Sequence, residues 1–306
     1  MIDVSIIIPT FNRRQDLIIA LESVFGQPNV RVEVIVIDDC SDDGTVEFIR
    51  EQYKCHQLVV IEKPNRSGPQ VSRNLGIAFA HGEFITFLDS DDYFEPDTLA
   101  GRVMRCRELQ LDALFSGYRV KFIGRRWDLI KSVKTVARTC PVNYTAALRD
   151  FKIAPMITIM YRRAMHECLK LDEGLASGHD DDLSLYLIKS SRYAFDDILA
   201  STIIQHVGGR VATPKNLMIG DAQLLKKYSG DISRYQGHVY LTRRLAKALA
   251  GLWSVGQFKQ TINLWPEGLS RSASITALAL GIIYLPQRLL EVMLLRAKMA
   301  AVRLVL

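Results

Sequence analysis

The stretch Phe84-Ile85-Thr86-Phe87-Leu88-Asp89-Ser90-Asp91-Asp92 governs the interpretation of the whole chain. Its apolar half, rich in aromatic and β-branched residues, predicts a buried strand that ends abruptly in three carboxylates. Ligands of α/β proteins bind outside the carboxyl ends of the strands. Clustered carboxylates repel one another and suit a hard divalent cation such as Mg²⁺ or Mn²⁺. An acidic turn that helps to cap the next helix is the alternative, and the stretch alone leaves both open.

Around this stretch, apolar runs alternate with amphipathic runs. Strands are predicted at 4–8, 32–37, 58–62, 112–118 and 155–163, and helices at 15–25, 45–53, 71–80, 97–109 and 183–189. This alternation specifies an α/β fold with a mostly parallel central sheet covered by helices. A second acidic cluster, Asp38-Asp39-Cys40-Ser41-Asp42-Asp43-Gly44, follows the strand at 32–37, so both clusters would face one crevice.

Composition narrows the class of protein. The 306 residues are 48% hydrophobic and contain five scattered cysteines without a C-x-x-C pair, which favours a reduced compartment over a disulfide frame or zinc site. No signal-peptide pattern fits the first residues. The net charge of +6 is compatible with phosphorylated ligands or anionic lipid, and no nucleic-acid-binding motif is present. Neither G-x-G-x-x-G nor G-x-x-x-x-G-K-[ST] occurs, which argues against dinucleotide-binding proteins and P-loop NTPases.

Five segments in order carry a resemblance to a known family. The chain resembles the family 2 glycosyltransferases of GT-A fold over roughly its first hundred residues, through Ile8-Pro9-Thr10-Phe11-Asn12, Ile37-Asp38-Asp39-Cys40-Ser41-Asp42-Asp43-Gly44-Thr45, Asn65-Arg66-Ser67-Gly68, Ser72-Arg73-Asn74-Leu75-Gly76 and Phe87-Leu88-Asp89-Ser90-Asp91-Asp92. The resemblance implies transfer of a sugar from a nucleotide-diphosphate donor, most often a UDP-sugar, to an acceptor hydroxyl with inversion of the anomeric carbon. It also implies a glycosyltransferase domain over residues 1–215.

The family's site residues carry over by position. Nucleotide contacts are expected from Pro9, Thr10, Asn12, Asp39, Arg73 and Asp89. A carboxylate only accepts hydrogen bonds, so Asp39 suits the ring N–H of uracil. Arg73 suits the diphosphate because its guanidinium is a permanent, forked donor. Turn formation and helix capping are the alternative for Asp39, and a surface ion pair is the alternative for Arg73.

A divalent cation, Mn²⁺ or Mg²⁺, is expected at Asp91 and Asp92, with His206 as a further candidate ligand. It would neutralise charge on the leaving diphosphate. His206 precedes Gly208-Gly209, which would allow a mobile loop, and a phosphate contact or a structural histidine is the alternative reading.

The general base is expected in Ser177-Gly178-His179-Asp180-Asp181-Asp182-Leu183. The family has Gly-Glu-Asp before an apolar helix, and here His179 replaces the usual Glu. The alignment assigns the base to Asp180, with Asp181 as the alternative. The same acids would form the first turn of a helix, where negative charge is stabilising, and the two roles are compatible.

From residue 216 to 306 the sequence is helical and basic. Residues 272–287 contain no charge but are too few to span a membrane, and the stretch from Arg288 is a basic amphipathic helix. An anionic membrane surface and a packed helical bundle are the two expectations. The combined hypothesis is a cytoplasmic enzyme, peripheral on the inner face of the cell membrane, that acts on a glycan or lipid-linked glycan in surface polysaccharide synthesis. A metal-dependent nucleotidyltransferase and a non-catalytic scaffold are the alternatives.

Overall fold

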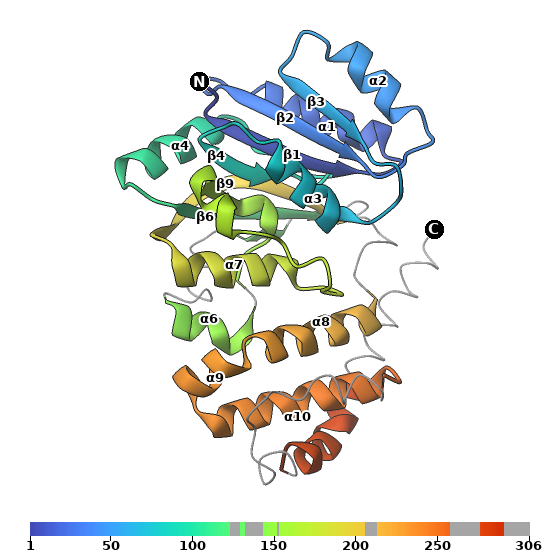
Figure 1. Cartoon of the computed structure of the whole chain (residues 1–306), viewed down its shortest axis with the longest axis vertical. Helices are drawn as coiled ribbons and strands as arrows, with labels where there is room; N and C mark the ends of the chain where they lie inside the picture. Colours follow the sequence, from blue (N-terminus) through green and yellow to red (C-terminus); the bar gives the residue numbers. More distant parts are fainter. Residues whose placement is uncertain (123–128, 132–142, 152, 206–212, 258–275, 291–306) are drawn as a thin grey trace. The chain divides into compact units, whose positions relative to one another are not determined.

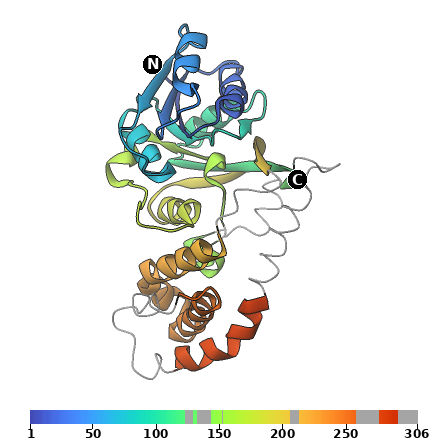
Figure 2. The ribbon, with the colours of Figure 1, turned by 90° about the vertical axis from the view of Figure 1, so that its right-hand side faces the viewer.

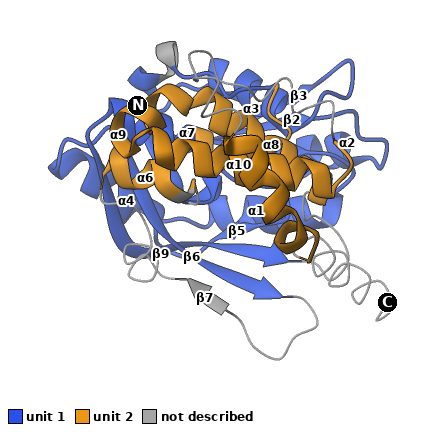
Figure 3. Ribbon diagram, turned by 90° about the horizontal axis from the view of Figure 1, so that it is seen from below, with its two compact units in different colours: residues 1–140, 152–173, 183–205 blue, residues 141–151, 174–182, 206–306 orange. Residues whose placement is uncertain are grey.

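The computed structural model describes residues 1–122, 129–131, 143–151, 153–205, 213–257 and 276–290. The chain divides into two compact units that interleave along the sequence (Figure 3). Unit 1 comprises Met1–Cys140, Lys152–Glu173 and Leu183–Gln205, and unit 2 comprises Pro141–Phe151, Gly174–Asp182 and His206–Leu306. The division expected after residue 215 stays a prediction.

Unit 1 is built on one mixed sheet with helices on it (Figure 1). Its strands are β1 (Val4–Thr10), β2 (Val32–Asp38), β3 (Leu58–Glu62), β4 (Phe84–Phe87), β5 (Tyr93–Phe94), β6 (Ala113–Phe122), β7 (Leu129–Lys131), β8 (Ile159–Arg162) and β9 (Tyr193–Gln205). Its helices are α1 (Arg14–Phe25), α2 (Thr45–Gln52), α3 (Pro69–Ala78), α4 (Leu99–Glu108), and the 3-10 turns η1 (Met156–Thr158) and η2 (Arg163–Cys168).

The strands run in the order β3-β2-β1-β4-β8-β6-β9-β5, with β7 paired to β6. The first four are parallel to one another, and β6 is parallel to β9. Strand β8 is antiparallel to both of its neighbours, β4 and β6. The predicted α/β class with a mostly parallel sheet is therefore confirmed.

Strand β1 lies at the centre of this arrangement and is buried along its whole length. Ile6 and Ile8 belong to one core cluster with Leu17 and Leu21 of α1. Ile7 points to the opposite face, where α3 packs: a Cβ on Gly76 would come 2.4 Å from Ile7 Cγ2, so only glycine permits this close approach. Buried parallel strands read as nearly continuous apolar runs, and this strand is apolar except for the buried residues Ser5 and Thr10.

Unit 2 contains four complete helices among the described residues, namely α6 (Tyr144–Asp150), α8 (Pro214–Lys227), α9 (Ser229–Gln236) and α10 (His238–Ser254). Helix α7 (His179–Ser190) begins in the unit 2 segment Gly174–Asp182 and continues in unit 1. Residues 276–290 are also helical. None of the described helices is both long and apolar enough to cross a membrane.

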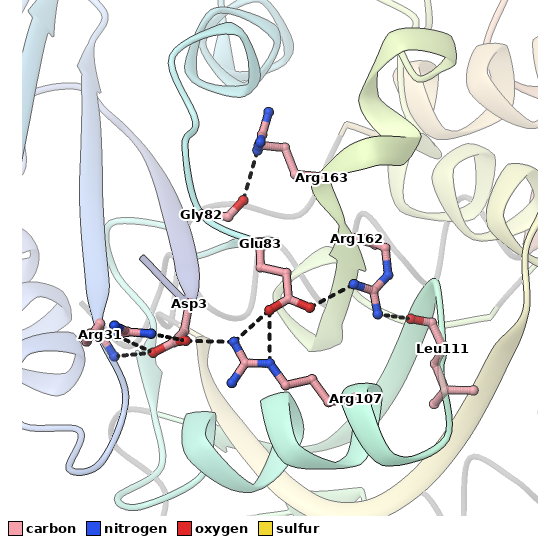
Figure 4. A network of polar contacts seen from close by, with 8 residues as sticks. All are labelled: Asp3, Arg31, Gly82, Glu83, Arg107, Leu111, Arg162 and Arg163. Atoms are coloured by element: carbon pink, nitrogen blue, oxygen red, sulfur yellow. Dashed lines mark hydrogen bonds and ion pairs between the residues drawn. The ribbon is translucent and has the colours of Figure 1, made fainter. Parts of the chain in front are cut away.

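The amino-terminal edge of the sheet is held by a network of acids and arginines (Figure 4). Asp3, which precedes β1, accepts hydrogen bonds from Arg31 Nε and Nη2, both at 3.1 Å, and from Arg107 Nη2 at 2.7 Å. Glu83, which precedes β4, accepts from Arg107 Nε at 2.9 Å and from Arg162 Nη1 at 2.7 Å. Arg107 thus joins the beginnings of two neighbouring strands.

Replacing Asp3 by Asn should lower the free energy of unfolding by about 2 kcal/mol at neutral pH, because charged hydrogen bonds are lost from a residue that is only 6% exposed. The bonds from Arg31 hold the pKa of Asp3 well below its usual range. A carboxyl whose pKa is lowered by folding stabilises the protein fully at pH values above its unfolded-state pKa, which is about 4. This stabilisation is lost progressively as the pH falls below that value toward the folded-state pKa. Urea unfolding at pH 7 and below pH 4 should therefore show the gap between the two proteins narrowing at acid pH.

The matched control is Glu51→Gln, which removes an acid from an exposed i,i+3 pair with Lys54. Exposed pairs contribute little, so this variant should unfold like the wild type. An Asp3→Asn protein that loses no more stability than this control would contradict the role assigned to the network.

Candidate functional site

The candidate site lies at the carboxyl edge of the four parallel strands of unit 1. The register pairs Thr10 of β1 with Asp38 of β2, and Asp38 with Glu62 of β3, so these strands end level with one another. Strand β4 runs parallel to β1 and leads directly into Asp89. The pairing therefore gathers Pro9, Thr10, the cluster after β2 and the cluster after β4 at one edge of the sheet, as the sequence predicts.

Asp39 is 7% exposed and holds the segment that leads into α3. Its Oδ1 accepts from Lys63 Nζ at 2.7 Å and from Ser67 N at 2.9 Å, and its Oδ2 accepts from Gly68 N at 2.9 Å. Burial alone would raise the pKa of Asp39, but the hydrogen bonds from Lys63, Ser67 and Gly68 outweigh it and lower the pKa. Since a carboxylate oxygen accepts about two hydrogen bonds, Oδ2 retains capacity for one more donor.

Lys63 is a site residue that the sequence reasoning missed. It follows β3 immediately, and its Nζ also donates to Ser67 Oγ at 2.6 Å. The side chains of Lys63 and Asp39 are 5% and 9% exposed, so the ion pair is buried. The rule that singled out the acids applies equally to this lysine, because it too stands directly after a parallel strand.

Asp38 and Asn12 shape the loops around Asp39. Asp38 accepts hydrogen bonds from the backbone N–H and the hydroxyl of Ser41, which closes a tight turn. Asn12 Nδ2 donates to Asp42 Oδ1 at 2.7 Å, and the backbone N–H of Asp42 donates back to Asn12 Oδ1 at 2.9 Å. The amide of Asn12 thus joins the loops after β1 and β2, and its contact with a nucleotide stays a prediction.

Phe11 and Arg66 form a second feature that the sequence reasoning missed. The guanidinium carbon of Arg66 lies 3.8 Å from the centroid of the Phe11 ring. Phe11 follows Thr10 at the end of β1, and Arg66 lies in the segment held by Asp39. A flat cation over an aromatic face is a cation–π contact, and both groups can stack on a planar ring.

Arginines oppose the acids that follow β4. Arg73 of α3 donates to Asp89, and Arg13 Nη1 lies 3.1 Å from Asp91 Oδ2. The side chain of Arg73 is 8% exposed and that of Asp91 is 2% exposed, so both ion pairs involve a buried partner. Arg73 reaches this place because α3 lies close against β1 at Gly76.

Asp92 is a buried carboxyl in the same cluster, and it is only 5% exposed. Burial and then the charge of Asp89 raise the pKa of Asp92 to about 8, although Oδ1 accepts a 2.8 Å hydrogen bond from Ile204 N. A carboxyl that is costly to ionise beside other acids is a site that gains from an added positive charge.

Two buried polar atoms at the edge have no hydrogen-bond partner among the described residues. They are Thr10 Oγ1 and Arg73 Nε, and their residues are 3% and 6% exposed. Buried polar atoms are nearly always satisfied in folded proteins, and an orphan indicates a missing water or ligand. One of these atoms is a hydroxyl and the other is a cationic donor, which suits a polar, anionic ligand.

The residues present fit a divalent cation bound together with a phosphorylated ligand. No group of three His, Cys, Asp or Glu side chains forms a closed metal cage in the described part of the chain. Mg²⁺ is commonly held by one or two carboxylates plus substrate phosphates, and Asp91 and Asp92 supply such carboxylates. His206, the further ligand expected from sequence, lies outside the described residues.

The candidate base segment belongs to unit 2. Asp180 and Asp181 lie in the first turn of α7, where the helix dipole stabilises negative charge. Helix α8 holds the backbone that leads into this turn, since Gln223 accepts from Ala176 N at 2.8 Å and donates to Gly174 O at 2.8 Å. A Cβ on Gly220 would come 2.6 Å from the carbonyl oxygen of Ser177, so the contact with α8 is close.

The third acid of this segment has a different role. Asp182 is 7% exposed and accepts from Lys227 Nζ at 2.8 Å and from Tyr228 OH at 2.7 Å. These bonds tie the start of α7 to the end of α8 within unit 2. Asp182 therefore positions the turn, and Asp180 and Asp181 remain the candidates for proton transfer.

The fold gathers polar and charged side chains at the ends of parallel strands, an arrangement that suits a phosphorylated ligand. The sequence profile of Glycosyl transferase family 2 matches residues 5–168. The chain belongs to this family, which confirms the resemblance described above and the prediction of a glycosyltransferase.

Two curated relatives illustrate the similarity. Succinoglycan biosynthesis protein ExoO of Rhizobium meliloti is 37% identical over 186 residues, which cover 58% of this chain and 53% of ExoO. TuaG of Bacillus subtilis, described as a putative teichuronic acid biosynthesis glycosyltransferase, is 34% identical over 116 residues, which cover 38% of this chain and 46% of TuaG. The chain thus spans about half the length of these relatives.

Solved structures show the same fold. A fragment of TarS from S. aureus, solved in complex with UDP-GlcNAc, has a TM-score of 0.61 at 19% identity over 98% of this chain and 89% of that chain. The mannosyltransferase PcManGT from Pyrobaculum calidifontis, in complex with GDP-Man and Mn²⁺, has a TM-score of 0.56 at 18% identity over 98% of this chain and 86% of that chain.

Replacing Lys63 by Met should lower the free energy of unfolding by about 3 kcal/mol, because a buried carboxylate loses its charged partner. Urea unfolding at neutral pH measures this loss. Lys54→Met is the matched control, since Lys54 forms an exposed pair with Glu51 and its loss should cost less than about 0.5 kcal/mol. Equal unfolding midpoints for the two variants would show that the Lys63–Asp39 pair does not stabilise the site.

Proposed function

We propose that the chain transfers a sugar from a nucleoside-diphosphate donor, a UDP-sugar, to a hydroxyl of a glycan or lipid-linked glycan during synthesis of a surface polysaccharide. The observation that carries this proposal is the gathering of Asp39, the orphaned atoms of Thr10 and Arg73, and the acids after β4 at one sheet edge. The names of the relatives support the class of product, and the UDP-GlcNAc bound to TarS supports the donor.

The nucleoside half of the donor would bind between the loops after β1, β2 and β3. The remaining acceptor position on Asp39 Oδ2 suits the ring N–H of uracil. Phe11 and Arg66 offer a stacked surface on which a base can lie, and base–aromatic stacking is worth about 1–3 kcal/mol. Pro9, Thr10 and Asn12 complete the loop after β1, and Asp89 would contact the ribose.

The diphosphate half would lie among Arg73, Arg13 and the acids after β4. A divalent cation, Mn²⁺ or Mg²⁺, would be held by Asp91 and Asp92, with His206 as the further proposed ligand. When bound, it would stabilise negative charge on the leaving diphosphate. The arginines would orient the phosphate oxygens through forked hydrogen bonds.

Asp180 would act as general base, with Asp181 as the alternative. The carboxylate would accept the proton of the acceptor hydroxyl while the hydroxyl oxygen attacks the anomeric carbon and the nucleoside diphosphate leaves from the opposite side. One displacement of this kind inverts the anomeric centre. Asp182 would keep the turn in place through Lys227 and Tyr228.

The proposal extends to the location of the enzyme and to its domains. A lipid-linked acceptor would place the chain in the cytoplasm, at the inner face of the cell membrane. Residues 1–215 would form the glycosyltransferase domain, and residues 216–306 would form a helical region with a separate role.

Calorimetric titration with UDP, with and without Mn²⁺, tests the donor and the cation together. We expect binding that strengthens with Mn²⁺ and exceeds that of GDP, TDP and CTP. The Asp91→Ala protein should lose the Mn²⁺-dependent part of the binding, because the carboxylate that holds the cation is gone. Unchanged Mn²⁺ dependence in this variant would remove Asp91 from the proposed site, and no binding of any nucleotide by the wild type would remove the proposal.

Substitution of Asp180 by Asn separates binding from catalysis. A positioned general base contributes typically 10²–10⁴-fold, so kcat should fall by about that factor while UDP binding is unchanged. Asp181→Asn is the matched comparison in the same helical turn, and its kcat should change by less than about tenfold. The rate of sugar transfer to the acceptor is measured through the release of UDP. The reverse ranking of the two variants would assign the base to Asp181.

A further inference from the structure

The helical segment 276–290 lies beside α10 (Figure 2). Ala277 is fully buried, and a Cβ on Gly281 would lie 3.3 Å from both Ala246 O and Leu249 Cβ. One turn further, Lys247 Nζ of α10 lies 5.7 Å from the centroid of the Tyr284 ring. Positions 277, 281 and 284 recur every three or four residues, which is one face of a helix.

The other side of the segment is apolar and open to solvent. Exposed fractions are 39% for Leu278, 64% for Ile282, 68% for Ile283, 42% for Leu289 and 57% for Leu290. At about 100° per residue these side chains form a continuous arc on the side away from α10. Arg288 is the one charged residue between 276 and 290. A monomer that stays in water rarely exposes such a group of large apolar side chains on one surface.

The charge of the chain is concentrated in the same region. Residues 238–306 contain nine Lys and Arg and two Asp and Glu, a formal charge of +7, whereas residues 1–237 sum to −1. In the described segments 238–257 and 276–290 the charged residues are Arg243, Arg244, Lys247 and Arg288, and there is no acid. Such an asymmetry indicates a partner of negative charge.

We propose that the exposed apolar face of residues 276–290 docks on an anionic lipid membrane. The helix would lie in the plane of the interface with Ile282 and Ile283 among the acyl chains, while the basic residues around it attract the anionic headgroups. A second copy of the chain is a poorer occupant, because the described segments 238–257 and 276–290 carry four basic residues and no acid, and two copies that met through them would repel each other. The proposal deepens the proposed function by naming the surface that brings the enzyme to a lipid-linked acceptor.

The test is co-sedimentation of the full-length protein with vesicles of phosphatidylcholine, with and without phosphatidylglycerol. We expect binding to the anionic vesicles that weakens as salt is raised, since the headgroup attraction is screened. The double substitution Ile282→Asp, Ile283→Asp should weaken this binding at least about tenfold, because two apolar side chains are lost and two negative charges are added.

Ile19→Asp is the matched control, because Ile19 is 57% exposed on α1 of unit 1 and lies outside the basic region. This variant should bind anionic vesicles like the wild type. Thermal unfolding of each variant reports on folding, and both substitutions are at exposed positions that a folded chain tolerates.

Three outcomes would overturn the proposal. They are equal binding to neutral and anionic vesicles, vesicle binding by the double variant equal to that of the wild type, and a dimer in light scattering that the double substitution dissociates. UDP calorimetry on the same proteins keeps the two proposals distinguishable. The double variant should bind UDP normally, and a wild type that binds vesicles but no nucleotide would refute only the sugar transfer.

Discussion

The parallel pairing of β1 with β2 on one side and β4 on the other is the constraint on which the rest of unit 1 depends. Parallel strands end at the same edge of a sheet, so the residues that follow them lie side by side along that edge. The pairing is stable because β1 is largely apolar and is buried along its whole length. Gly76 contributes directly, since it lets α3 approach Ile7 and so brings Arg73 to the acids after β4.

The acids at the two edges of the sheet differ in how completely they are hydrogen-bonded. At the amino-terminal edge, Asp3 and Glu83 are satisfied by arginines of unit 1, and the result is stability. At the carboxyl edge, Asp39 is satisfied by Lys63 and backbone N–H groups but keeps an acceptor position, and the neighbouring Thr10 hydroxyl has no partner among the described residues. A buried polar group that lacks some of its hydrogen bonds lowers the stability of the protein. Proteins retain such polar groups mainly in binding sites.

Unit 2 contains both the turn that carries Asp180 and the basic region with its exposed apolar side chains. Helix α8 holds the turn that carries Asp180, through hydrogen bonds of Gln223 and Lys227 with the segment Gly174–Asp182. The same unit carries the excess of basic residues and the exposed apolar side chains of 276–290. Positioning of the proposed base and attachment to an anionic surface are therefore assigned to one helical unit.

Sequence patterns alone predicted the four parallel strands with the helices between them, the strand ends that carry acids, and the family, but not the short strand β5. These features depend on local sequence. The strand predicted at 58–62 is observed as β3 (Leu58–Glu62), because a short apolar run bounded by polar residues is typical of a β-strand. The partner of each charged residue within a cluster became known only from the folded structure. Asp38 makes a turn while Asp39 meets Lys63, and Asp182 meets Lys227, since a carboxylate's partner depends on neighbours that are distant in the chain. For the same reason, composition marked an uncharged apolar stretch at 272–287, but packing on α10 decided which side of residues 276–290 is left exposed.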